Sequence, residues 1–231
     1  MIREISTPDP QHLAESLRLR VLAILQQAIA ARGSASLVVS GGRTPRRLFD
    51  LLAQSPLDWS KVSVTLADER LVARGHADHN AGLVRAHLLQ GKAAAAQFHP
   101  LWDGQGDPRA VAAAALAHFP AKFDVLLLGM GEDGHTASLF PDAPGLADAL
   151  DPAHADPLLI LPETASRQPR VSLSLSRLLA SAHILLAFEG EAKHAVFTRA
   201  MAEGPQAELP VRAVLRHAAV PVEVYWSQTT G

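Results

Sequence analysis

Short runs of apolar, strand-forming residues alternate with longer segments of helical spacing over most of this chain. Five runs have the length and composition of strands, at residues 36–39, 62–66, 123–128, 183–188 and 222–226. Five segments have helical patterns, at residues 45–53, 81–89, 107–118, 191–202 and 211–217. A further amphipathic helix is expected over residues 13–31, where leucine, valine and isoleucine recur on one face. This alternation predicts an α/β fold whose mainly parallel sheet is flanked by helices.

The composition is typical of a chain that buries a core. Apolar residues make up 48% of the 231 positions and charged residues 19%. This length suits one substantial α/β domain, so we expect residues 1–231 to form a single domain. Proline and glycine gather at residues 141–157 and 204–210, which are expected to be long surface connections.

Charge and cysteine content narrow the classes of function. The formal net charge is −2, so no broad electrostatic field favours nucleic acid or an anionic membrane. The absence of cysteine excludes thiolate chemistry and disulfides. The first ten residues contain no apolar run of signal-peptide length, and charged residues interrupt the helical pattern at 13–31. We therefore expect a cytoplasmic protein without a membrane span.

Ligands of open α/β sheets gather outside the carboxyl ends of the strands, so the segments that follow predicted strands deserve the most weight. The first such segment is Ser-Gly-Gly-Arg-Thr-Pro at residues 40–45. Thr44 suits a helix N-cap and Pro45 a first helical position. Paired glycines and a helix N-terminus can bind a phosphate, although an ordinary strand-to-helix turn has the same residues.

The second segment combines carboxylates with an arginine after the strand at 62–66. Asp68, Glu69 and Arg70 follow that strand, and Asp78-His79-Asn80 precede the next helical pattern. Such a group can orient hydroxyls or neutralise a phosphate or an oxyanion. A solvated charge cluster, with Asn80 as a helix cap, is the structural alternative.

The third segment is a glycine-rich turn after the strand at 123–128, and it contains Glu132, Asp133 and His135. We expect His135 to begin a very short helix, whose dipole would disfavour the protonated imidazole. A neutral imidazole is what a general base requires. A purely structural histidine that caps its turn is the alternative.

Other site chemistries fit this sequence less well. Gly129, Gly131 and Gly134 match a dinucleotide fingerprint, but Pro141 should end the helix that the fingerprint requires. His76 and His79 have metal-like spacing, yet no HExxH motif or second cluster accompanies them. No GxSxG elbow is present, which disfavours a serine nucleophile. Neither a metal nor a cofactor is expected.

Taken together, the three segments resemble the 6-phosphogluconolactonase family in residues, order and spacing. The segment at 129–141, Gly-Met-Gly-Glu-Asp-Gly-His-Thr-Ala-Ser-Leu-Phe-Pro, is the most specific, and the resemblance continues through Arg170 and Lys193. It implies a Rossmann-like fold shared with glucosamine-6-phosphate deaminases. It also implies hydrolysis of 6-phospho-D-glucono-1,5-lactone to 6-phosphogluconate, the second step of the oxidative pentose phosphate pathway, without a cofactor.

The resemblance also suggests a role for each site residue. His135 would take a proton from the attacking water, while Asp133 holds or tunes the imidazole. The residues expected to bind the substrate are Gly41, Gly42, Arg43, Thr44, Asp68, Arg70, Gly131, Arg170 and Lys193. The only expected partner is a phosphorylated sugar lactone, bound by a monomer or a weak homo-oligomer.

Two other functions remain open at this point. An aminosugar-phosphate deaminase or isomerase of the same fold needs a carboxylate base after the second strand, and Asp68 occupies that region. A sugar-phosphate sensor without catalysis would normally carry a DNA-binding segment and a basic face, and neither is apparent.

Overall fold

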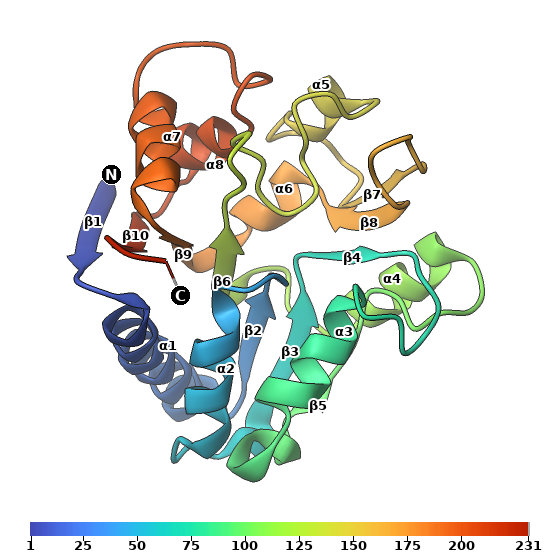
Figure 1. The fold of residues 1–231 in the computed structure, drawn as a ribbon. Helices are drawn as coiled ribbons and strands as arrows, with labels where there is room; N and C mark the ends of the chain where they lie inside the picture. Colours follow the sequence, from blue (N-terminus) through green and yellow to red (C-terminus); the bar gives the residue numbers. More distant parts are fainter. Residues whose placement is uncertain (231) are drawn as a thin grey trace.

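A computed structural model describes residues 1–230. Its main feature is a seven-stranded sheet in which all neighbouring strands are parallel. The order across this sheet is β1 (Ile2–Thr7), β10 (Val222–Ser227), β9 (Ser181–Glu189), β6 (Phe123–Gly129), β2 (Ala35–Val39), β3 (Val62–Leu66) and β5 (Gln97–Phe98). The α/β class and the mainly parallel sheet that the sequence predicts are confirmed (Figure 1).

The central strands are mostly apolar and almost wholly buried because both faces of the sheet are covered. Every residue of β2 is buried, and so are the first six residues of β6. Parallel strands between two helical layers have this continuous hydrophobic pattern, which explains why the sequence reveals them. The edge strand β1 was not predicted, since Arg3 and Glu4 interrupt its apolar residues.

The six predicted helices are present to within a few residues of their expected bounds. The helices of ten residues or more are α1 (Pro10–Arg32), α2 (Pro45–Gln54) and α7 (Glu191–Met201). Shorter ones are η1 (Trp59–Lys61), α3 (Asn80–Leu83) with its π-helical continuation η2 (Val84–Leu88), η3 (Gly91–Ala95), α4 (Pro108–Leu116), α5 (Leu146–Ala149), α6 (Leu175–Leu179) and α8 (Val211–His217). Of these, η1, η3, α5 and α6 were not predicted. The carboxylate of Asp9 caps the start of α1, and Gly33 ends it in a left-handed conformation with φ 79°.

A second, smaller sheet was not predicted from the sequence. It is antiparallel and has the order β4 (Asp68–Arg70), β8 (Arg170–Leu173) and β7 (Leu158–Leu161). Figure 1 shows β4 and β8 beyond the arrowheads of β2 and β3. The register places Arg70 directly opposite Arg170, and Asp68 opposite Ser172. This sheet therefore brings segments a hundred residues apart to the carboxyl edge of the main sheet.

One hydrophobic core contains side chains from both sheets. Val38 and Leu126 of the main sheet belong to the same buried cluster as Val171 and Leu158 of the small sheet. Among residues 1–230, no helix has the length and apolar character needed to cross a membrane.

Candidate functional site

A cavity of about 320 Å³ lies at the carboxyl ends of β2 and β6. These two strands are neighbours at the place where the strand order reverses direction, which is where ligands of open α/β sheets bind. Every predicted substrate-binding residue lines this cavity, and so does His135. Asp133 does not line it but contacts His135 directly.

The loop after β2 forms one wall of the cavity. Gly42 has φ 101°, a left-handed conformation that favours glycine. Gly41 lies so close to the side chain of Asn80 that a Cβ atom would collide with it. Helix α2 begins at Pro45 as predicted, but the side chain of Thr44 makes no capping hydrogen bond. The hydroxyl of Thr44 is thus not used by the helix that follows it.

The loop after β6 places His135 at the opposite wall. The backbone N–H of Gly131 donates to the carbonyl of His135 at 2.9 Å, and that of Gly134 donates to the carbonyl of Gly131 at 3.1 Å. Gly131 touches the imidazole so closely that a Cβ atom there would overlap it. The non-glycine residue Ala137 has φ 48°, a strained value often seen at functional sites.

The prediction that His135 begins a short helix is wrong. Residues 131–140 form tight turns with an isolated bridge between Thr136 and Leu139, so no helix dipole acts on the imidazole. The physical reason is the hydrogen bonding of this segment, in which the hydroxyl of Thr136 donates back to the carbonyl of Gly129 at 2.9 Å. A different group must fix the tautomer and the orientation of the His135 ring.

That group is Asp133. Its Oδ1 atom lies 2.5 Å from Nδ1 of His135 and also accepts the backbone N–H of His135 at 3.1 Å. Burial acts to raise the pKa of Asp133, but the hydrogen bonds and charge of His135 outweigh it and hold that pKa below the usual 3.8. An ionised carboxylate here assigns the proton to Nδ1, which leaves Nε2 with a free lone pair.

Asp68 is buried in a polar cluster instead of being solvated. Its Oδ2 atom accepts a 2.5 Å hydrogen bond from the hydroxyl of Ser138 and contacts Nη1 of Arg170 at 3.4 Å. Ser138 is itself fixed, because its backbone N–H donates to the hydroxyl of Ser172 at 3.2 Å. The cluster links the histidine loop to β4 and β8 of the small sheet.

Glu69 is buried beside Asp68 but serves the backbone. Its two carboxylate oxygens accept the N–H groups of Arg70, Asn80 and Ala81 at 2.7–2.8 Å. Glu69 thus caps the start of α3, in place of the cap expected from Asn80. The side chain of Asn80 instead donates to the carbonyl of Asp68 at 3.0 Å.

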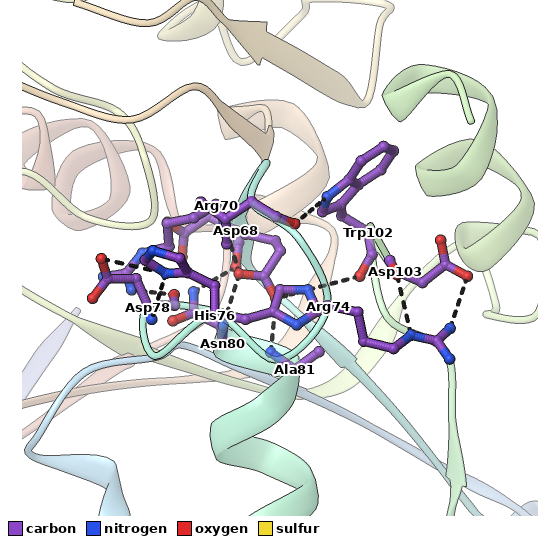
Figure 2. Close-up of polar contacts among 12 residues, drawn as sticks. Asp68, Arg70, Arg74, His76, Asp78, Asn80, Ala81, Trp102 and Asp103 are labelled. Atoms are coloured by element: carbon purple, nitrogen blue, oxygen red, sulfur yellow. Dashed lines mark hydrogen bonds and ion pairs between the residues drawn. The ribbon is translucent and has the colours of Figure 1, made fainter. Parts of the chain in front are cut away.

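The loop between β4 and α3 lies next to Asp68 and Asn80, as Figure 2 shows. Arg70 donates to the carbonyl of Asp78 at 2.6 Å, and the indole N–H of Trp102 donates to the carbonyl of Val72 at 2.9 Å. Arg74 pairs with Asp103 at 3.3 Å further along the loop. The contact with Asp78 holds the guanidinium of Arg70 beside the cavity.

The cavity is strongly cationic. Arg43, Arg70, Arg167, Arg170 and Lys193 line it, whereas Asp68 is the sole carboxylate among the described residues that do so. The Nε atoms of Arg70 and Arg170 and the hydroxyl of Ser40 are buried without a protein partner. Burial lowers the pKa of Lys193, against the charges of Glu132 and Glu189. Buried donors without partners are costly, so they indicate a ligand that accepts hydrogen bonds.

Sequence reasoning missed several residues of this site. Ser40, Phe140 and Arg167 line the cavity, and Ser138 donates to Asp68. Asn80, which the sequence suggested only as a helix cap, also lines it. Ser40 and Ser138 sit inside the motifs at 40–45 and 129–141, so the motifs themselves were the available signal. Arg167 lies in a segment without any motif, and its place depends on the unpredicted strand pairing of β7 with β8.

The histidines with metal-like spacing do not form a metal site. The ring of His79 is buried and contacts the carbonyl of Trp102 at 3.2 Å, while His76 lies beside Asp78 at the exposed surface. Within residues 1–230, no group of three His, Asp or Glu side chains is arranged to hold a metal ion.

Comparison with known proteins places this chain in a family. The family model described as glucosamine-6-phosphate isomerases/6-phosphogluconolactonase matches residues 8–226. The 6-phosphogluconolactonase of Mesorhizobium japonicum is 48% identical over 95% of this chain and 93% of its own. That of Pseudomonas aeruginosa is 45% identical over 92% of this chain and 90% of its own.

Solved structures agree with this assignment. The crystal structure of a 6-phosphogluconolactonase from Shewanella baltica superposes with a TM-score of 0.92, at 41% identity and with 98% of both chains covered. This chain belongs to the glucosamine-6-phosphate isomerase/6-phosphogluconolactonase family.

Proposed function

We propose that this chain hydrolyses 6-phospho-D-glucono-1,5-lactone to 6-phosphogluconate, the second step of the oxidative pentose phosphate pathway. The observation that carries the proposal is the pair of Asp133 and His135, joined at 2.5 Å, at the wall of a cationic cavity. The pair supplies a base for water, and the cations suit a phosphate. The relatives that share close to half of this sequence are 6-phosphogluconolactonases.

The reaction needs a water, a base and a stabilised oxyanion. Nε2 of His135 takes a proton from the attacking water as its oxygen bonds to the lactone carbonyl carbon. Negative charge then develops on the carbonyl oxygen, where the cationic lining of the cavity stabilises it. When the intermediate collapses, the bond from this carbon to the ring oxygen breaks, and the imidazolium returns the proton to that oxygen.

Asp133 stabilises the imidazolium that forms during the reaction. Its carboxylate accepts the Nδ1–H bond, so the positive charge on the ring has an ionised partner 2.5 Å away. The same contact helps to fix the orientation of the ring. Phe140 also fixes it, because it packs against the imidazole with ring centroids 4.4 Å apart. The base is therefore oriented before the substrate arrives.

The phosphate is anchored away from the reacting carbon. The Gly41-Gly42-Arg43-Thr44 loop at the start of α2 offers backbone amides, and Arg70, Arg170 and Lys193 offer charge. Asp68 orients Arg170 through its 3.4 Å contact. Binding energy from the phosphate then serves to place the carbonyl beside His135.

The deaminase or isomerase alternative is less well supported by this geometry. That chemistry needs a carboxylate free to remove a proton from carbon. Asp68 is instead engaged by the hydroxyl of Ser138 at 2.5 Å and by Arg170, which stabilise it as a fixed acceptor. A sensor that binds without turnover has no use for the Asp133–His135 pair.

A single assay separates these functions. Acid release from freshly generated lactone should exceed spontaneous hydrolysis in a buffer that contains a chelator, and glucosamine 6-phosphate should yield no ammonia. Ammonia release without lactone hydrolysis would establish the deaminase instead. Phosphosugar binding without either reaction would favour the sensor.

We further propose that the enzyme works in the cytoplasm as a monomer or a weak homo-oligomer. The near-neutral charge balance and the lack of a long apolar helix in residues 1–230 are compatible with this. Sedimentation at several protein concentrations would test the assembly state, and a stable tetramer at micromolar concentration would contradict it.

A further inference from the structure

Arg167 occupies an unexpected place for a residue at the tip of a surface hairpin. A tight turn joins β7 to β8, with hydrogen bonds between the backbones of Thr164 and Arg167 at 2.9 and 3.3 Å. Although neighbouring residues of this turn are exposed, the side chain of Arg167 is only 19% exposed and lines the cavity. The turn therefore directs this guanidinium inward.

The contacts of Arg167 join it to the groups around His135. Its guanidinium lies over the ring of Phe140 at 4.3 Å, and that of Arg170 lies over the same ring at 5.1 Å. Phe140 in turn packs on His135. The ring thus supports both guanidiniums beside the cavity.

Arg167 also forms an ion pair with an exposed carboxylate, and this ion pair is weak. Nη2 of Arg167 lies 2.5 Å from Oδ1 of Asp142, whose side chain is 69% exposed. Ion pairs with such an exposed carboxylate are screened by water and contribute little. Burial is the main cause that lowers the pKa of Arg170. The negative charge of Asp68 raises this pKa, while the positive charges of Arg70 and Arg167 lower it further.

We infer that Arg167 is a further substrate-binding residue, which exchanges Asp142 for the phosphate of the bound lactone. The inference rests on the proposed function for the identity of the ligand. A phosphate inside the cavity is a dianion at neutral pH and accepts hydrogen bonds from a guanidinium bidentately. Asp142 is then a competitor that holds Arg167 near the cavity when the substrate is absent.

Opposite effects of two substitutions test this assignment. Arg167→Met keeps the apolar contact with Phe140 but removes the charge, and it should raise both KM and the dissociation constant of inorganic phosphate by about tenfold. Asp142→Asn removes the competitor and should tighten phosphate binding several-fold. Arg167→Lys keeps the charge and should recover part of the affinity. Asp142→Asn should leave kcat within about twofold of the wild type, and the pH profile of kcat should be unchanged in all three variants.

A matched control is available elsewhere on the surface. Arg109 and Asp156 form an ion pair of the same 2.5 Å length, and neither residue lines the cavity. Arg109→Met and Asp156→Asn should leave phosphate binding and KM unchanged. If the control variants change phosphate affinity and KM as much as the Arg167 and Asp142 variants do, the inference is wrong, because general surface charge would then explain both sets of changes.

Calorimetric titration with inorganic phosphate keeps this test independent of turnover. If Arg167→Met binds phosphate like the wild type, or if Asp142→Asn weakens binding as Arg167→Met does, the inference is wrong and the pair is structural. If Arg167→Met lowers kcat and alters its pH profile with phosphate affinity unchanged, Arg167 acts through Phe140 on His135 and the inference is again wrong. A wild type that binds phosphate but does not hydrolyse the lactone would refute the proposed function alone.

Discussion

The tautomer and the orientation of His135 depend on one neighbour two positions away. Both residues belong to a single motif, so the sequence was sufficient to pair them, and the structure adds the 2.5 Å contact through Nδ1. What the sequence could not supply is how the ring is held. A short helix was expected around His135, whereas the turn geometry lets the carboxylate of Asp133 fix the tautomer and the orientation of the ring.

Asp133→Asn tests the choice of tautomer. The amide that replaces the carboxylate can donate to Nδ1, which favours the proton on Nε2 and removes the lone pair that the water needs. We expect kcat to fall roughly 10²–10⁴-fold, measured by acid release under saturating lactone. A variant with wild-type kcat would mean that Asp133 has no part in orienting the base.

Gly131→Ala tests whether one added carbon atom can disturb the catalytic pair without destabilising the fold. The added Cβ would overlap the imidazole of His135 and the carboxylate of Asp133, which are side chains that can shift, while Gly131 itself has no strained φ. We expect a fall in kcat of at least about tenfold with a change in unfolding free energy below about 1 kcal/mol. A large loss of stability with intact kcat in the remaining folded protein would contradict this description.

At the scale of elements, the small sheet determines which residues meet. Five strands of the main sheet are visible in the sequence because they are mostly apolar, but β4 is three residues long and consists of Asp68, Glu69 and Arg70. Its charged residues indicated a solvated cluster, yet pairing with β8 and the caps on α3 bury two of them. Such long-range pairing has no local signal in a single sequence.

Glu69→Gln tests how α3 is attached to β4. A glutamine offers one oxygen to three backbone N–H groups, so one donor loses its partner and the unfolding free energy should fall by about 1–3 kcal/mol. Urea denaturation followed by circular dichroism measures this loss, and Glu163→Gln on the exposed turn is the control. An unchanged midpoint would contradict the capping role of Glu69.

The same variant should alter how stability depends on pH. Burial raises the pKa of Glu69 from 4.5 to about 7, against the three N–H donors. Between these values the folded protein binds the proton more tightly than the unfolded chain, so this group lowers stability as pH rises through the window. Glu69→Gln should therefore show a flatter fall in stability from pH 5 to pH 7 than the wild type.

At the scale of the whole molecule, the fold class and the parallel sheet could be predicted, whereas the strand order could not. The order depends in part on the two edge strands, β1 and β5. Neither has a clear signal in the sequence, because β1 is partly polar and β5 is only two residues long. The position of the site was nevertheless predictable, because any parallel order places the loops at residues 40–45 and 129–141 at the same edge of the sheet.

The prediction of one domain is testable by unfolding. Trp59, Trp102 and Trp226 are buried in distant parts of the chain, and the core cluster contains residues of both sheets. We expect the urea transitions followed by tryptophan fluorescence and by far-ultraviolet circular dichroism to coincide, as for one cooperative unit. Two separated transitions would indicate that the small sheet and its loops unfold on their own.

The central claim is that His135 activates water while other residues bind the phosphate. The most direct measurement compares wild type and His135→Gln for kcat on 6-phosphogluconolactone and for the dissociation constant of inorganic phosphate, both in a buffer with chelator. The account predicts a loss of roughly 10²–10⁴-fold in kcat, with phosphate affinity within about twofold of the wild type. A variant that keeps wild-type turnover would contradict the account, and so would one that loses turnover only because it no longer binds phosphate.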